Sequence, residues 1–333
     1  MTAADAVAVA LWLGVTLYVV FGGADFGTGL WDLTAGAADR GERPRDLIDH
    51  AIGPVWEANH VWLIFCLVVL WTGFPRAFAA VMTTLYVPLS LAAFGIVLRG
   101  AGFAFRKATA GKAAQRSYST VFAVSAILTP FFLGAALGGI ASSRVPVRGS
   151  GNLLTSWVNP TSLFVGSLAV AICAYLAAVF LTIDSRRLGQ GDLERYFLRR
   201  ALVAAVVAGA AAFAGLFVLR ADAPHLYRGL TGRALPLVVV SITCGSAVLL
   251  LLARGARPGT RVLAVGAVAS MVWAWGVAQY PYLLPERLTV AGGAAVPPTL
   301  RAILVVVGAA LVLVGPSLAL LFVLDQRSRL NVR

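Results

Sequence analysis

The sequence predicts an all-α integral membrane protein with nine transmembrane helices. Of its 333 residues, 59% are hydrophobic and only 12% are charged, whereas a soluble domain carries about 25% charged residues. The apolar residues gather into long runs separated by short polar connections. A helix needs about 20 mostly apolar residues to cross the hydrocarbon core of a bilayer.

Nine apolar runs meet this length criterion. They lie at 6–25, 53–72, 78–98, 118–141, 160–183, 201–219, 234–253, 262–281 and 301–324. Because the connections are short, we expect residues 1–333 to form a single polytopic membrane domain. No basic stretch precedes the first run, so we expect it to be a retained span and not a cleaved signal peptide.

Basic residues predict the orientation of the chain. The connections after the first, third, fifth and seventh runs, together with the C-terminal tail, hold 19 of the 27 Lys and Arg residues. Cytoplasmic loops carry such an excess, so we expect the N-terminus outside and the C-terminus in the cytoplasm. The net charge of +13 is then a topology signal, and we expect no nucleic-acid partner.

The second run opens with the most unusual segment of the chain, IGPVWEANHVW at 52–62. It combines a carboxylate, an amide, an imidazole and two indoles, while most of the runs carry no charge. Ionisable groups inside a bilayer cost about 2.5–3.5 kcal/mol each on insertion scales, so each one indicates function. The candidate residues in this segment are Trp56, Glu57, Asn59, His60 and Trp62.

The predicted topology places three charged side chains at a similar depth near the cytoplasmic face. Asp25 ends the first run, Glu57 lies about one turn into the second, and Arg99 ends the third. Burial disfavours the charged form of a carboxylate, which suits Glu57 and Asp25 to carrying protons. The alternative is a structural ion pair with Arg99 or with a partner subunit. In either case, we expect the functional motifs within 20–107.

Metal and haem ligands are scarce. Glu57 and His60 share a helix face, but a carboxylate-bridged di-metal site needs a second Glu-x-x-His motif and two more glutamates, which the runs lack. His can ligate haem, yet His50 and His225 fall in loops on opposite sides of the membrane. We therefore expect no metal site and no assigned haem in this chain, and a hydrogen-bonded role for His60.

Three further patterns predict packing. Trp56 suits an interfacial anchor, whereas Trp62 lies about 9 Å deeper by helical rise and suits packing or stacking. Glycines four residues apart, at 23 and 27 and again at 134 and 138, predict close helix contacts. Cys66, Cys173 and Cys244 sit inside apolar runs without CxxC spacing, so we expect free, core-packing thiols.

Taken together, four segments resemble the second subunit of cytochrome bd-type quinol oxidases. They are GGADFGTG (22–29), IGPVWEANHVW (52–62), RGAGFAFR (99–106) and GVAQYPYLLP (276–285). These segments follow the order of the family and span most of the chain. The resemblance implies two four-helix bundles plus one peripheral helix, in a multi-pass protein of the bacterial plasma membrane.

The resemblance also implies a partner and an activity. A larger subunit I would hold the haems of b and d type and the quinol site, and the complex would oxidise quinol and reduce O₂ to water. In some members a proton path runs through the second subunit, through positions that match Glu57 and Trp62 here. This chain would then carry no catalytic residue of its own. Small accessory subunits and a bound membrane lipid or quinone are left open.

Three positions depart from the pattern of some relatives. Glu57 stands where they have Asp, His60 where they have Gln, and Ala104 where they have an acid. A proton path here lacks that last acid, so water or Asp25 would have to replace it. Two alternatives stay open: a secondary transporter with a site at Asp25, Glu57 and Arg99, and a purely structural scaffold subunit.

Overall fold

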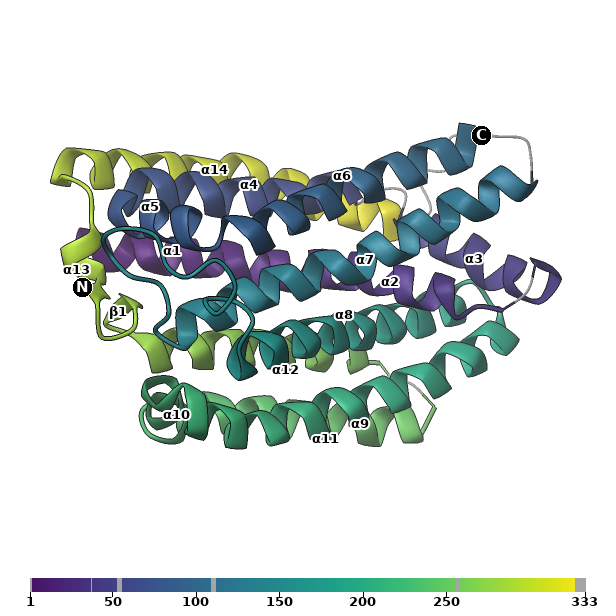
Figure 1. Ribbon diagram of the computed structural model, residues 1–333. Helices are drawn as coiled ribbons and strands as arrows, with labels where there is room; N and C mark the ends of the chain where they lie inside the picture. The colour runs from purple at the N-terminus through teal and green to yellow at the C-terminus, as the bar shows by residue number, and fades with distance from the viewer. Residues whose placement is uncertain (1, 37, 53–55, 109–111, 256–257, 327–333) are drawn as a thin grey trace.

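The computed structural model describes residues 2–36, 38–52, 56–108, 112–255 and 258–326, some of them by their backbone alone. Long helices lie side by side and make up nearly all of it (Figure 1). In chain order the elements are α1 (Ala3–Leu17), η1 (Tyr18–Gly22), α2 (Gly23–Leu33), α3 (Ala38–Ile52), α4 (Trp56–Gly73), α5 (Pro75–Thr84), α6 (Tyr86–Ala108), α7 (Lys112–Ala141), α8 (Pro160–Arg187), α9 (Gly191–Asp222), α10 (Pro224–Thr231), α11 (Leu235–Ala253), α12 (Thr260–Gln279), β1 (Tyr282–Leu284), β2 (Leu288–Thr289), α13 (Val290–Gly293) and α14 (Pro297–Gln326).

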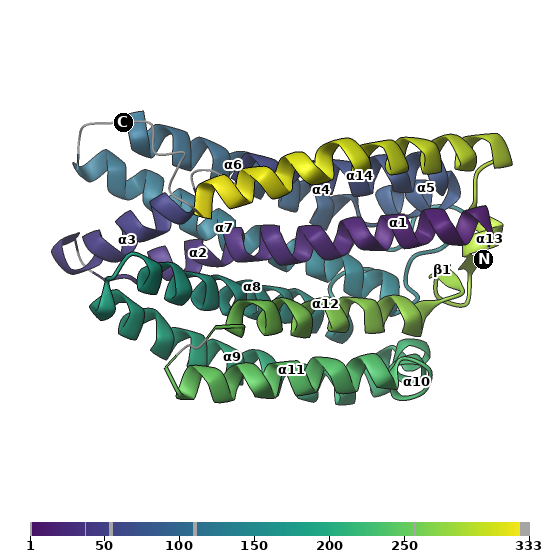
Figure 2. The ribbon, with the colours of Figure 1, turned by 180° about the vertical axis from the view of Figure 1, so that it is seen from behind.

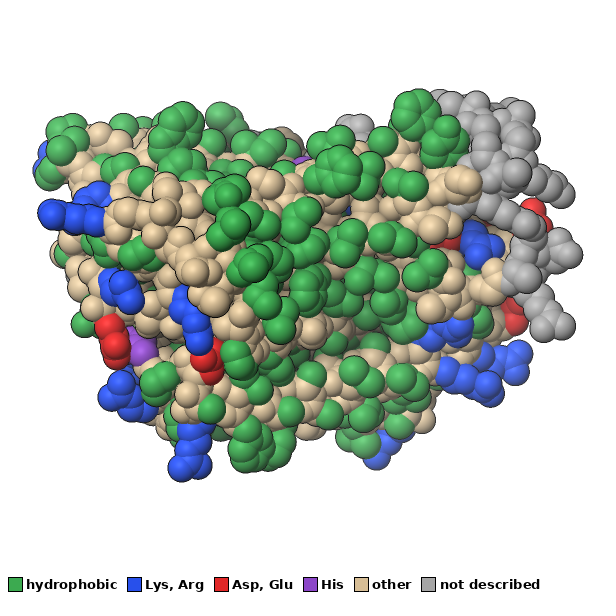
Figure 3. All heavy atoms as spheres, in the orientation of Figure 1, with side chains coloured by type: hydrophobic (Ala, Val, Ile, Leu, Met, Phe, Trp, Pro, Cys, Tyr) green, Lys and Arg blue, Asp and Glu red, His purple; other side chains and the backbone are tan. Residues whose placement is uncertain are grey.

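The all-helical membrane architecture is confirmed. Among the described residues, eight helical segments are long and apolar enough to cross a bilayer, and α4 with α5 makes a ninth candidate if that bent pair counts as one span. Figure 3 shows a broad surface of apolar side chains between two ends that carry the Lys and Arg side chains. The helix α14 starts beside the beginning of α1 and runs to the opposite end (Figure 2).

The first helical rod is longer than predicted. The segments α1, η1 and α2 form one continuous stretch from Ala3 to Leu33, eight residues past the predicted end at 25. Asp25 therefore lies within a helix and not at its end. Likewise α6 continues through Arg99 to Ala108. The count of basic residues had placed Arg99 in a connection, whereas it lies within a helix.

The third predicted run, 78–98, is wrong as a single helix. The structure breaks it at Leu85, between α5 and α6, and α5 is bent by 118° from α4. Proline accounts for the break, because Pro88 has no N–H to donate to the carbonyl of Thr84 and its ring clashes with that carbonyl. Hydropathy continues across the break, so length and polarity alone could not reveal it.

Close helix contacts occur at both predicted glycine pairs. A Cβ on Gly27 would overlap the main-chain carbonyl of Cys173, and one on Gly138 would overlap the backbone of Ser162. The absence of side chains at these glycines lets α2 and α7 approach α8 at backbone distance. Helix α8 is thereby packed against α2, α7 and α9 at once. It contributes many of the fully buried side chains of the core, Leu176 among them.

Two features near the helix ends were not predicted. The charged connection after the first run forms a helix, α3, which packs on α2 and α8. After α12 ends at Gln279, the chain forms a small antiparallel hairpin of β1 and β2.

Ion pairs tie the ends of the bundle. Arg144 donates two hydrogen bonds to Asp222, of 2.6 and 3.0 Å, and Asp222 also accepts from the backbone N–H and hydroxyl of Thr161 at the start of α8. At the other end, Arg261 bonds Asp184 at 2.9 Å. Each aspartate thus has an arginine partner at an end of the bundle.

Candidate functional site

A buried ion pair joins Asp25 of α2 to Arg99 of α6. The guanidinium Nη2 lies 2.7 Å from Oδ1 of Asp25 and also donates to its main-chain carbonyl at 2.8 Å. The exposed fractions of the two side chains are 2% and 3%. Taking two charges out of water is costly, and their attraction offsets the cost only when geometry is good and hydrogen bonds are made. The two hydrogen bonds from Arg99 supply this geometry for Oδ1 and the main-chain carbonyl of Asp25.

Aromatic rings enclose the cation. The guanidinium carbon of Arg99 lies 4.2 Å from the ring centroid of Phe122 on α7 and 5.1 Å from that of Phe26 on α2. Such ring faces attract a cation, and more strongly when water is excluded. The ring of His60 on α4 packs edge-on against Phe26, with centroids 6.2 Å apart. The pair is therefore shared by helices α2, α4, α6 and α7.

Small residues of α2 make room for this arrangement. A Cβ on Gly29 would overlap that of Ala126 and would lie 3.4 Å from Nη1 of Arg99. The hydroxyl of Thr28 donates to the carbonyl of Asp25 at 2.6 Å. The GADFGTG segment thus places a carboxylate where a neighbouring helix can approach closely enough for an arginine to reach it.

The structure brings Asp25 and Arg99 together in the interior of the protein. Both lie inside helices that continue for two turns or more, to Leu33 and Ala108. The ion pair with Arg99, one of the two alternatives for Asp25, is the arrangement observed. Ala104 lies on the exposed face of α6, so its side chain does not point into the cluster around Asp25.

The second-run motif forms the start of α4. Its backbone is helical from Trp56, but the side chains of Trp56 and Glu57 lie outside those that the structure describes. Asn59 is buried, at 3% exposure, and His60 lies against the Asp25 cluster. Trp62 packs edge-on against Phe65, with ring centroids 6.4 Å apart.

Sequence reasoning missed one residue of this cluster, Tyr18. Its ring packs edge-on against Phe26, with centroids 6.4 Å apart, and its hydroxyl is shielded from solvent. Nothing in the sequence distinguishes it, because a single tyrosine in an apolar run can equally face lipid. Its position on a π-helical turn, η1, is visible only in the structure.

The histidines and cysteines of the described residues lie apart from one another. Among the described residues, no group of three or more His, Cys, Asp or Glu is arranged to hold a metal ion. His60 packs on Phe26, while His225 packs on Tyr282 beside the hairpin. The two imidazoles face different parts of the fold and do not form a bis-His pair. All three cysteines are free, as predicted.

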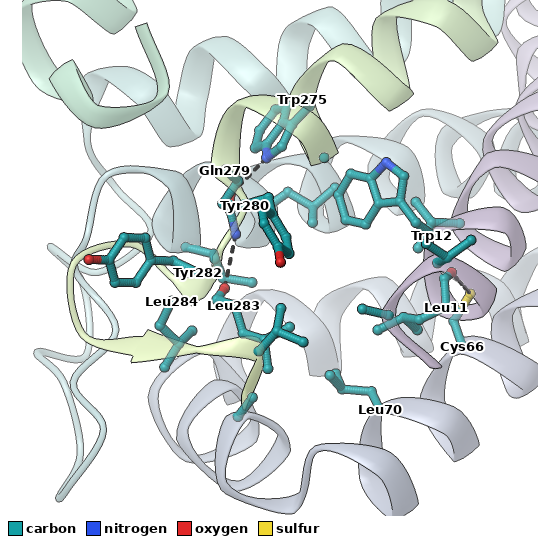
Figure 4. A pocket seen from close by; sticks show the side chains of 18 of the residues that line it. Leu11, Trp12, Cys66, Leu70, Trp275, Gln279, Tyr280, Tyr282, Leu283 and Leu284 are labelled. Carbon is teal, nitrogen blue, oxygen red and sulfur yellow. Dashed lines mark hydrogen bonds between the residues drawn. The ribbon is translucent and has the colours of Figure 1, made fainter. Parts of the chain in front are cut away.

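A separate apolar cavity lies at the other end of α1 (Figure 4). It measures about 320 Å³ and is lined by α1, α4, α5, α7, α12 and the hairpin. Three of its polar side chains are hydrogen-bonded within the protein: Trp12 donates to the carbonyl of Val272, Trp275 to Gln279, and Gln279 to the carbonyl of Leu283. This cavity offers apolar surface but few polar groups, unlike the Asp25 cluster.

The chain is similar to known membrane proteins over nearly its whole length. Residues 3–324 match the family described as cytochrome bd terminal oxidase subunit II. The Bacillus subtilis putative cytochrome bd menaquinol oxidase subunit II is 22% identical, over 97% of this chain and 95% of its own length. The cytochrome bd ubiquinol oxidase subunit 2 of the same organism is 24% identical over 67% of this chain. The match covers 64% of that relative, just under two thirds of its length.

A solved structure extends the similarity to the whole fold. The bd oxidase from Geobacillus thermodenitrificans matches with a TM-score of 0.77 and 26% identity, covering 97% of this chain and 98% of the other. Family and fold agree over nearly the full length, which favours the oxidase interpretation over the transporter. This multi-pass bacterial membrane protein therefore belongs to the cytochrome bd terminal oxidase subunit II family.

Proposed function

We propose that this chain works as subunit II of a quinol oxidase that transfers electrons from quinol to O₂ and forms water. The observation that carries this proposal is the family match over residues 3–324. The matched fold of a bd oxidase over 97% of the chain supports it. The obligate partner is a larger subunit that holds the haems of b and d type and oxidises quinol.

We place the haems in the partner subunit, because two of the described histidines already pack against other side chains of this chain. His60 packs edge-on against Phe26, and His225 lies beside the carboxylate of Glu286, 3.8 Å from Nδ1 to Oε1. The contribution of this chain is therefore structural support and proton supply, and electron transfer stays in the larger subunit.

The architecture is proposed to follow the two-bundle plan. Helices α8, α9, α11 and α12 contact one another, while the α1–η1–α2 rod, α4, α6 and α7 surround the Asp25 cluster. Helix α14 contacts α1 and α4 from outside, which suits the peripheral helix. The excess of Lys and Arg in alternate connections supports an N-terminus outside and a C-terminus in the cytoplasm.

Protons are proposed to enter from the cytoplasmic side at the start of α4. Glu57 is the entry group, since it follows the first indole of the motif on the first turn of that helix. His60, one turn further, already contacts Phe26 beside the Asp25–Arg99 pair. Glu57, Asp25 and Trp62 are the candidate path residues, and Trp56, Asn59, His60 and Arg99 support them by packing and charge.

The test is to express the chain together with the large oxidase subunit of the same genome and to purify the complex. We expect the reduced-minus-oxidised spectrum of haems b and d, and O₂ uptake that depends on added quinol. A stable complex without haem signals, or one that consumes no O₂ with quinol, would refute the assignment.

A further inference from the structure

Tyr18 approaches the Asp25 cluster from the first rod. It begins η1, seven residues before Asp25, and its hydroxyl has no hydrogen-bond partner among the described residues. Its ring packs edge-on against that of Phe26, which follows Asp25 in the chain and also lies 5.1 Å from the guanidinium carbon of Arg99. A buried hydroxyl beside a buried charge pair is costly unless it finds a partner.

The direction of the ring follows from Gly22. A Cβ at Gly22 would lie 3.1 Å from Cε2 of Tyr18 and 3.7 Å from its Cζ. The ring thus lies over Gly22, on the side of Tyr18 that leads toward Asp25. The π-helical turn between Tyr18 and Gly22 supplies this geometry, and such turns often occur at functional sites.

Asp25 offers a matching acceptor. Arg99 bonds Oδ1, whereas Oδ2 is buried and has no hydrogen-bond partner within the described part of the chain. The Asp25 side chain is only 2% exposed in the isolated chain, so a partner subunit that docks on the surface cannot reach it. A buried water typically bonds to about three otherwise unsatisfied polar groups.

We propose that Tyr18 and Asp25 hold a water between Oη and Oδ2, and that this water moves protons past the ion pair. This inference rests on the proposed proton role of the chain. A protonated Asp25 gives its proton to the water, the water gives one of its own to Oη, and the hydroxyl releases its original proton onward. One proton enters, one leaves, and no electron moves. The proton thereby moves along the rod, since the Cα of Tyr18 lies about 10 Å from that of Asp25 by helical rise.

The variant that tests this is Tyr18→Phe, which removes one oxygen and keeps the ring. Tyr175→Phe is the matched control, because Tyr175 on α8 is 5% exposed and its hydroxyl also has no hydrogen-bond partner among the described residues. Tyr175 lines a different cavity, between α8, α9, α11 and α12.

We expect Tyr18→Phe to keep its haem content and to slow quinol-dependent O₂ uptake about fivefold, the effect of one ordinary hydrogen bond. Its solvent isotope effect should rise, while Tyr175→Phe keeps both parental values. Parental uptake and isotope effect in Tyr18→Phe would overturn the inference. If quinol-dependent O₂ uptake is slowed in Glu57→Gln and Asp25→Asn but not in Tyr18→Phe, only this inference fails. If none of the three is slow, the proposed proton role fails.

A high-resolution cryo-EM map of the intact complex gives a readout independent of turnover. We expect a water between Oη of Tyr18 and Oδ2 of Asp25, and its loss in Tyr18→Phe. A map that resolves other buried waters but shows none at this position would overturn the inference.

Discussion

Arg99 bonds Asp25 twice with one nitrogen, once through the carboxylate at 2.7 Å and once through the main-chain carbonyl at 2.8 Å. The second bond holds the backbone of α2 in place, in addition to the side chain of Asp25. A buried charge left without its partner destabilises a protein by about 3–5 kcal/mol. We therefore expect Arg99→Met to lower the thermal midpoint of the purified complex sharply.

The double variant separates stability from function. Replacing a whole buried ion pair by apolar groups is often neutral, so Asp25→Leu combined with Arg99→Met should recover most of the thermal midpoint. If the pair also serves proton transfer, O₂ uptake should stay low in the recovered complex. Recovery of uptake together with stability would show that the pair is only structural.

Close packing at Gly27 gives a second prediction. A Cβ there would overlap the carbonyl of Cys173, and backbone on both sides leaves nothing flexible to move. We expect Gly27→Ala to reduce the yield and the thermal midpoint of the complex. Gly209→Ala on α9 is the control, since a Cβ there meets no atom within 4 Å. Equal behaviour of the two variants would mean that α2 and α8 can separate at no cost.

Asp222 yields a third prediction. It accepts bonds from Arg144 and from the backbone and hydroxyl of Thr161, and its side chain is 16% exposed. Hydrogen bonds to a charged group contribute about 1.5–3 kcal/mol, so Asp222→Ala should lower the unfolding midpoint measurably. Asp192→Ala should not, because the Asp192–Arg43 pair is at least half exposed on both sides and exposed pairs add little. A larger loss in Asp192→Ala would contradict this ranking.

The sequence predicted the fold class and most of the spans because hydropathy and length decide them. It did not predict helix ends or breaks. The predicted first run ends at Asp25 because that residue is charged. A helix can continue past a charged residue that is paired inside the protein, and this one continues to Leu33. The break at Leu85 depends on proline geometry, and the hairpin after α12 has too few residues to give a periodic pattern.

The site was predictable only in part. Charges within apolar runs identified Asp25 and Arg99, and their pairing was one of two stated alternatives. The burial of the pair comes from neighbouring helices, which the hydropathy of a single run does not reveal. Tyr18 was missed because an unpartnered hydroxyl is a property of the packed structure and not of the sequence.

Oxygen uptake by Glu57→Gln tests the proton-supply role most directly. The control is Glu42→Gln, which neutralises an exposed glutamate on α3. With haem content equal to the parent in both complexes, we predict slowed quinol-dependent O₂ uptake in Glu57→Gln and parental uptake in Glu42→Gln. Parental uptake in a fully assembled Glu57→Gln complex would contradict the account and leave the chain as a scaffold.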